Sequence, residues 1–200
     1  MRGVGDFFER IIDLDVTAAE AGSLADRTVD WMVSHGRLRR ETSGEAMYSL
    51  HAETGYLPGP EWPGITREWG ADWIPGPVAV IVGRHAHYGG QGEIEPAWAG
   101  CPRCGARTVI IDYPTAWEAD PEVWRPFATA IESWERTGSG TAACPSCAAA
   151  SPITEWTWAD EFALGALALD FWGWPPLTDE FVAELTTFLA HRVEHHSGKF

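Results

Sequence analysis

The amino-acid sequence predicts an α+β fold in which helices pack on an antiparallel or mixed sheet, with a zinc-ribbon-like module inserted into the chain. Three observations favour this fold. Apolar residues recur at helical spacing near both ends of the 200-residue chain, a β-branched run lies between them, and two Cys-Pro-x-Cys motifs follow that run. Because both helices lead directly into short strand-like segments, a duplicated, ferredoxin-like arrangement is one form that the sheet could take.

The first helix is expected at residues 18–34. Thr17 and Glu20 match a capping box, and apolar residues then recur at helical spacing until Gly36 ends the pattern. A short strand is expected directly after it, at 37–40. This end of the chain therefore predicts one helix followed by one strand.

The middle of the main body combines a loop with buried strands. Residues 54–77 contain five prolines and five glycines, which predicts an irregular loop. The β-branched run at 78–82 predicts a buried strand. Residues 163–171 are expected to form another strand, because Gly165 lies within them and a Trp-Gly-Trp-Pro-Pro sequence bounds them.

The C-terminal helix has clear local signals. Thr178 is suited to the N-cap, and an apolar stripe follows until the helix ends near Ala190. We expect His191 and Arg192 in its last turn, and a strand at 192–196.

The cysteines lie in a segment that we interpret as an insertion. We expect residues 1–96 and 161–200 to form the main body and residues 97–160 the zinc-ribbon-like insertion. Within the insertion, 107–113 is expected to be a strand, and Asp120-Pro121 is expected to open a helix.

Composition limits the classes of partner. Fourteen basic and 29 acidic side chains give a net charge of −15, which repels phosphate backbones and anionic lipids, so nucleic acid is a poor candidate partner. No targeting segment is evident in the first residues, and no apolar run approaches the ~18 residues of a membrane span. We therefore expect a soluble protein of the cytoplasm, where thiols stay reduced and paired cysteines favour metal over disulfides.

The four cysteines are the strongest functional signal. Cys101-Pro-Arg-Cys104-Gly and Cys144-Pro-Ser-Cys147 each place two thiols on one turn, and two such turns supply the four ligands that structural zinc prefers. The second motif lacks the glycine of the first, so its local geometry is less defined. Iron could occupy the same four sulfurs. A redox dithiol is the competing interpretation, but two such turns, the first followed by a strand, favour metal.

Tryptophan is concentrated in the insertion, which holds six of the twelve. Indoles at the surface would mark a protein interface. The alternative is that they cover the metal site and supply its core, because small metal modules have little other core. Any indole that remains exposed would indicate a binding face.

Histidines form a second candidate site. His85 and His87 are two residues apart, so they would point to one face of a strand and could bind a metal or act as acid and base. The sequence has no carboxylate or third histidine at a spacing typical of a metal or catalytic site. This favours the interpretation that the two histidines are ordinary polar residues at the end of a strand. His191, His195 and His196 could meet them only through the fold.

Other motifs are weak or missing. Asp13 with Asp15 and Glu93 with Glu95 are acid pairs at strand spacing, and such pairs arise readily by chance among 29 acids. The sequence contains no Walker A, G-x-G-x-x-G, G-x-S-x-G or H-E-x-x-H motif. The common nucleotide-binding and hydrolase classes therefore have no support.

The segment Phe171-Trp-Gly-Trp-Pro-Pro-Leu177, followed by Phe181-Val-Ala-Glu-Leu185 and preceded by the two Cys-Pro-x-Cys motifs, resembles a group of small uncharacterised actinobacterial proteins. In that group a similar aromatic-Trp-Pro-Pro-Leu segment precedes the last helix, and some members carry a transporter-ATPase label. ATP chemistry would need a phosphate-binding loop, which this sequence lacks. The resemblance covers the C-terminal half and the first helix; it supports the zinc module and implies no activity.

We expect a non-enzymatic interaction protein, such as an adaptor or an immunity-like neutraliser, whose acidic surface and exposed indoles bind a basic partner. The alternative is a small-ligand-binding protein or enzyme with a site near His85 and His87. A third hypothesis is a regulator that senses zinc or thiol oxidation through its cysteines. The sequence does not determine the oligomeric state, although a homodimer would bury some of the tryptophans.

Overall fold

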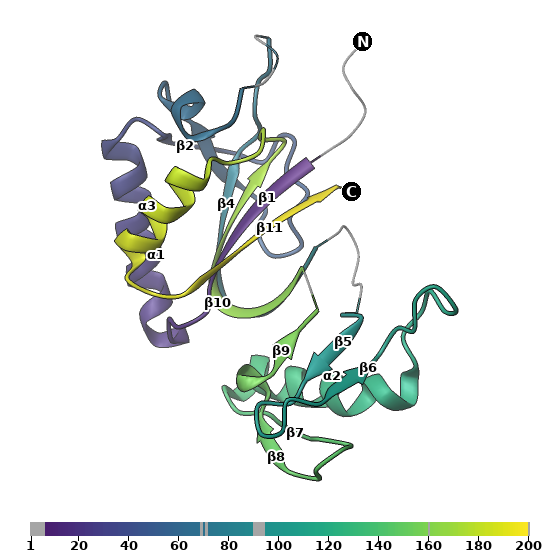
Figure 1. The fold of residues 1–200 in the computed structure, drawn as a ribbon. Helices are drawn as coiled ribbons and strands as arrows, with labels where there is room; N and C mark the ends of the chain where they lie inside the picture. Colours follow the sequence, from purple (N-terminus) through teal and green to yellow (C-terminus); the bar gives the residue numbers. More distant parts are fainter. Residues whose placement is uncertain (1–6, 69, 71, 90–94, 160, 200) are drawn as a thin grey trace. The chain divides into compact units, whose positions relative to one another are not determined.

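The computed structural model describes residues 7–68, 70, 72–89, 95–159 and 161–199 (Figure 1). The chain forms two compact units, unit 1 (Met1–Gly83 and Gly165–Phe200) and unit 2 (Arg84–Leu164). The sequence placed the divisions at 96/97 and 160/161 instead. The observed divisions lie inside two long strands, β4 (Val78–Tyr88) and β10 (Phe162–Trp172), and each strand contributes part of its length to each unit.

Unit 1 contains a six-stranded sheet in the order β11-β1-β10-β4-β3-β2. The four remaining strands are β1 (Phe7–Asp13), β2 (Leu38–Ser43), β3 (Gly55–Pro58) and β11 (Val193–Lys199). Strand β1 pairs antiparallel with both β10 and β11. The predicted α+β class is therefore confirmed, with antiparallel pairing.

Two helices complete unit 1, α1 (Ala18–Ser34) after β1 and α3 (Asp179–Leu189) after β10. The order β11-β1-β10-β4, with these two helices, agrees with a β-α-β-β-α-β connectivity of the ferredoxin-like kind. Strands β2 and β3 extend that sheet at one edge.

The helices lie together on one face of the sheet (Figure 1). Alternate residues of the central strands, such as Ile11 and Leu169, point to this face and pack with Met32 of α1 and Leu185 of α3. The opposite face carries a smaller cluster of Phe8, Ala79 and Trp172, against which Met47 and Ala52 pack. Both faces of the central strands are therefore covered, which explains why residues 165–172, the part of β10 in unit 1, are all buried.

A buried ion pair joins the two central strands. Arg10 and Asp170 stand directly opposite each other in the register of β1 and β10. The guanidinium donates from Nε to Oδ1 at 2.5 Å and from Nη2 to Oδ2 at 2.7 Å, and the Asp170 side chain is 0% exposed. Such a bidentate pair compensates for removing both charges from water, whereas either partner alone would not.

The helix ends follow their local signals with two differences. Helix α3 begins as expected, because the Thr178 hydroxyl accepts from the Phe181 N–H at 3.2 Å. It ends at Leu189, with Ala190 in the left-handed region (φ 58), so His191 follows the helix instead of belonging to its last turn. At α1 the Thr17 hydroxyl donates to the Glu20 carboxylate at 2.6 Å and does not cap a backbone N–H.

Several strand bounds differ from those predicted. The Pro-rich segment contains β3 and a 3-10 helix, Trp62–Ile65, so it is not irregular throughout. Strand β4 continues to Tyr88, and the two histidines lie within it and not after it. Strand β1 was not predicted from the sequence.

We expect Asp170→Ala to lower the free energy of unfolding by about 3–5 kcal/mol, because it leaves the Arg10 guanidinium buried without its carboxylate. Urea unfolding followed by far-UV circular dichroism measures this change. The matched control is Asp30→Ala, which removes an exposed pair with Arg40 in the same unit and should change stability by about 1 kcal/mol or less. Replacing both members by apolar residues, Arg10→Met with Asp170→Leu, should restore most of the loss. Equal urea midpoints for wild type and Asp170→Ala would contradict the assigned role.

Candidate metal centre

Unit 2 is built from short strands around one helix. Its sheets have the orders β6-β5-β9 and β7-β8. The strands are β5 (Trp98–Gly100), β6 (Arg107–Val109), β7 (Thr141–Ala143), β8 (Ala150–Pro152) and β9 (Thr157–Trp158). A one-turn 3-10 helix, Ile153–Glu155, follows β8. The strand predicted at 107–113 therefore ends early, because Ile110 and Ile111 turn into the core.

Helix α2 (Pro121–Thr137) supplies the largest part of the core of unit 2. It begins as predicted, because one carboxylate oxygen of Asp120 accepts from the N–H groups of Glu122 and Val123. Its buried face carries Phe127, Ile131 and Trp134. The cluster that contains this face also contains Cys101 and Cys144, so the first cysteine of each motif belongs to the core.

Each cysteine motif forms the turn of a hairpin, between β5 and β6 or between β7 and β8. In the first turn the Cys101 N–H donates to Ala106 O at 2.9 Å and the Gly105 N–H donates to Cys101 O at 2.9 Å. The second turn repeats both bonds: the Cys144 N–H donates to Ala149 O at 3.0 Å, and the Ala148 N–H donates to Cys144 O at 2.8 Å. The two motifs therefore have the same backbone geometry.

Backbone N–H groups also point at the sulfurs. The Arg103 N–H donates to Cys101 Sγ, and the Ser146 N–H donates to Cys144 Sγ, both at 3.4 Å. Such bonds stabilise negative charge on a thiolate ligand and fix its direction.

The missing glycine of the second motif does not change this geometry. Gly105 has a φ of 71, and Ala148, which stands at the equivalent position, has a φ of 57. Both residues are in the left-handed region, which an alanine enters only at a cost of about 1–2 kcal/mol. The sequence left the geometry of the second turn less defined, because this turn has no glycine. In the structure it nevertheless adopts the geometry of the first turn, with Ala148 in a backbone conformation that alanine disfavours.

The four sulfur atoms converge. All lie within 4.8 Å of one another, with Cys101 and Cys147 Sγ 3.9 Å apart and Cys104 and Cys144 Sγ 3.8 Å apart. Zinc–sulfur bonds of about 2.3 Å in a tetrahedron require sulfur separations of about 3.8 Å. The spacing is too long for a disulfide, whose sulfurs are about 2.05 Å apart, and all four cysteines are free. The donor set therefore fits zinc, and it would also fit iron.

The cluster is asymmetric in its exposure and its acidity. Cys101 and Cys144 are buried, whereas Cys104 and Cys147 are exposed. The pKa of Cys144 is lowered to about 6, first by the backbone N–H of Cys147. For Cys104 the Ala106 N–H acts to lower the pKa, but proton sharing with Cys147 and the other thiols, together with desolvation, raises it to about 12. The geometry thus already favours a thiolate at one of the buried positions.

Most tryptophans of unit 2 belong to its core. Trp134 and Trp156 are buried, and Trp98, Trp124 and Trp158 are half-buried. Arg107 lies over the Trp98 ring, 4.1 Å from its centroid, in a cation–π arrangement. The interpretation that the indoles cover the module accounts for these five. Trp117 is different, because 77% of its surface is exposed.

The structure separates the histidines into different environments. On β4, His85 is half-buried and His87 is buried, with ring centroids 6.3 Å apart. On β11, His195 and His196 are consecutive and so point to opposite faces. Among the residues that the structure describes, the cysteines form the one group of three or more residues whose ligand atoms are close enough to share an ion.

The C-terminal histidines instead pair with carboxylates. His195 Nε2 lies 2.6 Å from Glu9 Oε2, and His196 Nε2 lies 2.9 Å from Glu194 Oε2. His191 Nδ1 lies 2.8 Å from Asp13 Oδ2. The pairs of His195 and His191 join β11 and the turn before it to β1, whereas the His196–Glu194 pair lies within β11.

Of the two predicted acid pairs, Asp13 with Asp15 and Glu93 with Glu95, the structure describes only the first completely. Asp13 Oδ1 accepts from the N–H groups of Asp15 and Val16 and so shapes the turn before α1. The Asp15 carboxylate binds the Arg192 guanidinium, which lowers the Asp15 pKa. Glu93 lies outside the described residues. The first pair is therefore structural.

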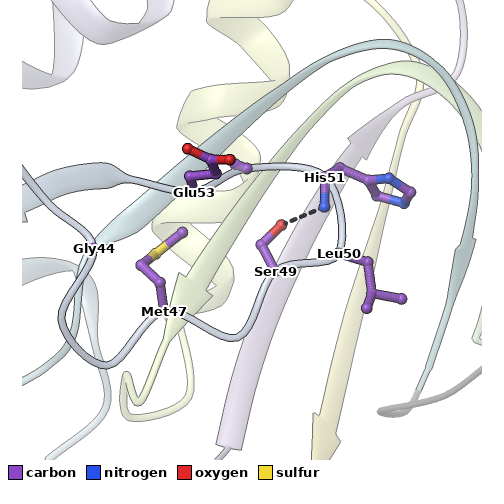
Figure 2. Close-up of a pocket in the computed structure, with 7 residues that line it drawn as sticks. Gly44, Met47, Ser49, Leu50, His51 and Glu53 are labelled. Carbon is purple, nitrogen blue, oxygen red and sulfur yellow. Dashed lines mark hydrogen bonds between the residues drawn. The ribbon is translucent and has the colours of Figure 1, made fainter.

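A cavity of about 500 Å³ opens beside a loop of unit 1 (Figure 2). It is lined by Gly44, Met47, Ser49, Leu50, His51, Ala52 and Glu53. Burial lowers the pKa of His51; the Asp170 carboxylate opposes this effect and Arg10 adds to it. His51 therefore stays neutral to lower pH than an ordinary histidine. Neither of the predicted histidines of β4 lines this cavity.

No protein-family model, curated protein or solved structure matches the chain. Within the described ranges, no helix is both long enough and apolar enough to cross a membrane.

We expect the purified protein to bind one zinc ion per chain, measured by elemental mass spectrometry after dialysis. Cys101→Ser should weaken zinc affinity by more than about tenfold, because even residues that only support ligands contribute about 10- to 100-fold. The control is Ser146→Ala, which changes an exposed side chain of the second turn but keeps the N–H that donates to Cys144. Affinity should also fall as pH is lowered, because protons compete for the thiolates. A Cys101→Ser protein with unchanged metal content would be evidence against the site.

The equivalent positions Gly105 and Ala148 should respond in opposite directions. No atom lies within 4 Å of a Cβ added at Gly105, so Gly105→Ala should destabilise the zinc-loaded protein only through its backbone, by about 1 kcal/mol. Ala148→Gly relieves the same strain of about 1–2 kcal/mol, but the greater freedom of glycine in the unfolded chain costs about 0.4–1 kcal/mol, so the net effect should lie between none and a gain of about 1.6 kcal/mol. Denaturant unfolding of both variants measures the signs. Destabilisation by Ala148→Gly would show that the alanine methyl group has a packing role.

Proposed function

We propose that this protein is a zinc-stabilised, non-enzymatic interaction module, an adaptor or immunity-like protein, that binds a basic protein partner. The observation that carries the proposal is the cysteine cluster, whose four sulfurs fit one tetrahedral ion. Four thiolates fill the coordination sphere of zinc and leave no position for water or substrate. Bound zinc would stabilise unit 2 without activating a substrate.

The net charge of the chain favours a basic partner. A net charge of −15 raises the local concentration of cations and speeds the association of basic proteins, while it repels nucleic acids. Unit 2 also places a large apolar side chain, Trp117, at the surface. Tryptophan is among the residues that contribute most to binding energy at protein interfaces.

The alternatives are less well supported. A ligand site near His85 and His87 stays a prediction, and the cavity described above involves other residues. Regulation by zinc or by thiol oxidation also stays a prediction. It gains some support from the exposure of Cys104 and Cys147, because accessible thiolates are the ones that oxidants reach.

The proposal predicts partners that depend on both zinc and charge. The tagged, zinc-loaded chain is used for affinity capture at low salt, each recovered protein is purified, and its dissociation constant is measured with the chain at 50 and 500 mM salt. We expect basic partners whose affinity falls by at least about tenfold over this range, because screening weakens attraction between exposed charges. Cys144→Ser should lose the partner together with its zinc, whereas Ser146→Ala should keep both. Recovery of no protein that binds directly at low salt would contradict the proposal.

A further inference from the structure

The exposed aromatic residues of unit 2 are concentrated in one loop, residues 110–120, here called the aromatic loop. Its base is fixed, because Ile110 and Ile111 are buried in the core and the Asp120 N–H donates to Ile110 O at 2.9 Å. The two ends of the loop are thus held together at the start of α2. The loop projects from the core of the same unit that holds the cysteine cluster.

The tip of the loop presents two aromatic rings to solvent. Tyr113 is 45% exposed and Trp117 is 77% exposed, and their ring centroids are 5.2 Å apart at 67°. Such an edge-to-face pair is a favourable aromatic geometry, so each ring helps to orient the other. The pair leaves large apolar and π surfaces uncovered by any other described part of unit 2.

Hydrogen bonds within the loop set the turn that carries this pair. The N–H groups of Thr115 and Ala116 donate to Asp112 O at 2.8 and 3.0 Å. The Thr115 hydroxyl lies 2.7 Å from Asp112 Oδ2 as well. A ligand would therefore bind a turn that is already formed, which reduces the entropy lost on binding.

The charged side chains of the aromatic loop itself are all acidic. Residues 108–124 contain four acidic residues, Asp112, Glu118, Asp120 and Glu122, and no lysine or arginine. Glu122 is paired with Arg125, and Asp120 caps α2, whereas Asp112 and Glu118 flank the aromatic residues in the sequence. Aromatic faces beside carboxylates attract cations by both cation–π and Coulomb interactions.

Charge complementarity selects among the occupants of this surface. Nucleic acid and anionic membranes would bring phosphate groups against the carboxylates, which is unfavourable. A second copy of the chain docked through the same loop would place two acidic loops together and is unfavourable for the same reason. A basic segment of another protein has no such conflict.

We propose that Tyr113 and Trp117 form a docking surface for arginine or lysine side chains of a basic protein segment. This inference rests on the proposed interaction function and assigns it a place and a recognition chemistry. The partner's cation lies against the indole of Trp117, and Asp112 and Glu118 supply the opposite charge. Arginine is favoured over lysine, because its planar guanidinium stacks on aromatic rings and is less strongly hydrated.

The test uses the full, zinc-loaded chain and a fluorescein-labelled peptide of four Gly-Arg repeats, with fluorescence anisotropy as the measurement. Trp117→Ala should weaken binding by at least about tenfold, the effect of removing a central aromatic contact. Trp117→Phe should keep most of the affinity, because it preserves an aromatic face. Leu50→Ala is the control, since it removes an exposed apolar side chain from unit 1 and should leave affinity unchanged. Circular dichroism and zinc content verify that each variant is folded.

Further arms identify the chemistry. A matched Gly-Lys peptide should bind more weakly than the Gly-Arg peptide, and a Gly-Glu peptide should not bind. Glu118→Lys should weaken binding of the Gly-Arg peptide while leaving zinc content unchanged. Equal binding of the Gly-Arg and Gly-Glu peptides would overturn the cationic chemistry.

The failure of this surface is distinguishable from failure of the proposed function. If a partner recovered at low salt binds wild type and Trp117→Ala equally well, the aromatic loop is not the docking surface, although the interaction function stands. If wild type binds no partner and no peptide, both proposals fail. Binding that is lost in Trp117→Ala and retained in Leu50→Ala supports both.

Discussion

The convergence of four cysteine sulfurs is the constraint on which unit 2 depends. The strands of its two small sheets, β5 to β9, contain two or three residues each, and sheets of that size have little stability of their own. The two hairpins that carry the cysteines are separated in sequence by α2, and their sulfurs nevertheless approach within 4.8 Å. A shared metal ion would join these hairpins directly, in addition to their hydrophobic cluster, and its binding would then be coupled to folding.

Unit 1 is organised by a different principle. Its central strand β1 has buried acidic and basic side chains, Glu9, Arg10 and Asp13, in addition to its apolar residues. Each has a partner on a neighbouring segment: His195 for Glu9, Asp170 for Arg10 and His191 for Asp13. Buried charge is tolerated only where it is paired in this way. The pairs act together with the apolar alternation to fix the register of β1 between β10 and β11, because a shift by one residue would place each charge on the wrong face.

The sequence predicted the elements whose signals are local and missed those whose signals are distant. Helix α2 was evident because Asp120-Pro121 and its apolar face lie within one segment, and the clustering of the four cysteines was predictable because their spacing is itself the motif. Strand β1 was missed because an arginine such as Arg10 is expected at the surface. Its burial becomes understandable only with its partner Asp170, which lies 160 positions away in the sequence. Composition likewise left open whether the indoles would cover the module or lie at its surface, and only the fold shows that Trp117 is the exposed one in unit 2.

The four thiols are unequally exposed, so solvent reaches the cluster from one side. The first cysteine of each turn is anchored in the core, while Cys104 and Cys147 face solvent. An arriving ion would therefore meet the outer pair first and reach the inner pair only as its last water molecules depart. The ion would leave by the reverse path, so a competing chelator would first bind it on the side of Cys104 and Cys147. Metal binding and metal release would then use the same route, past these two outer thiolates.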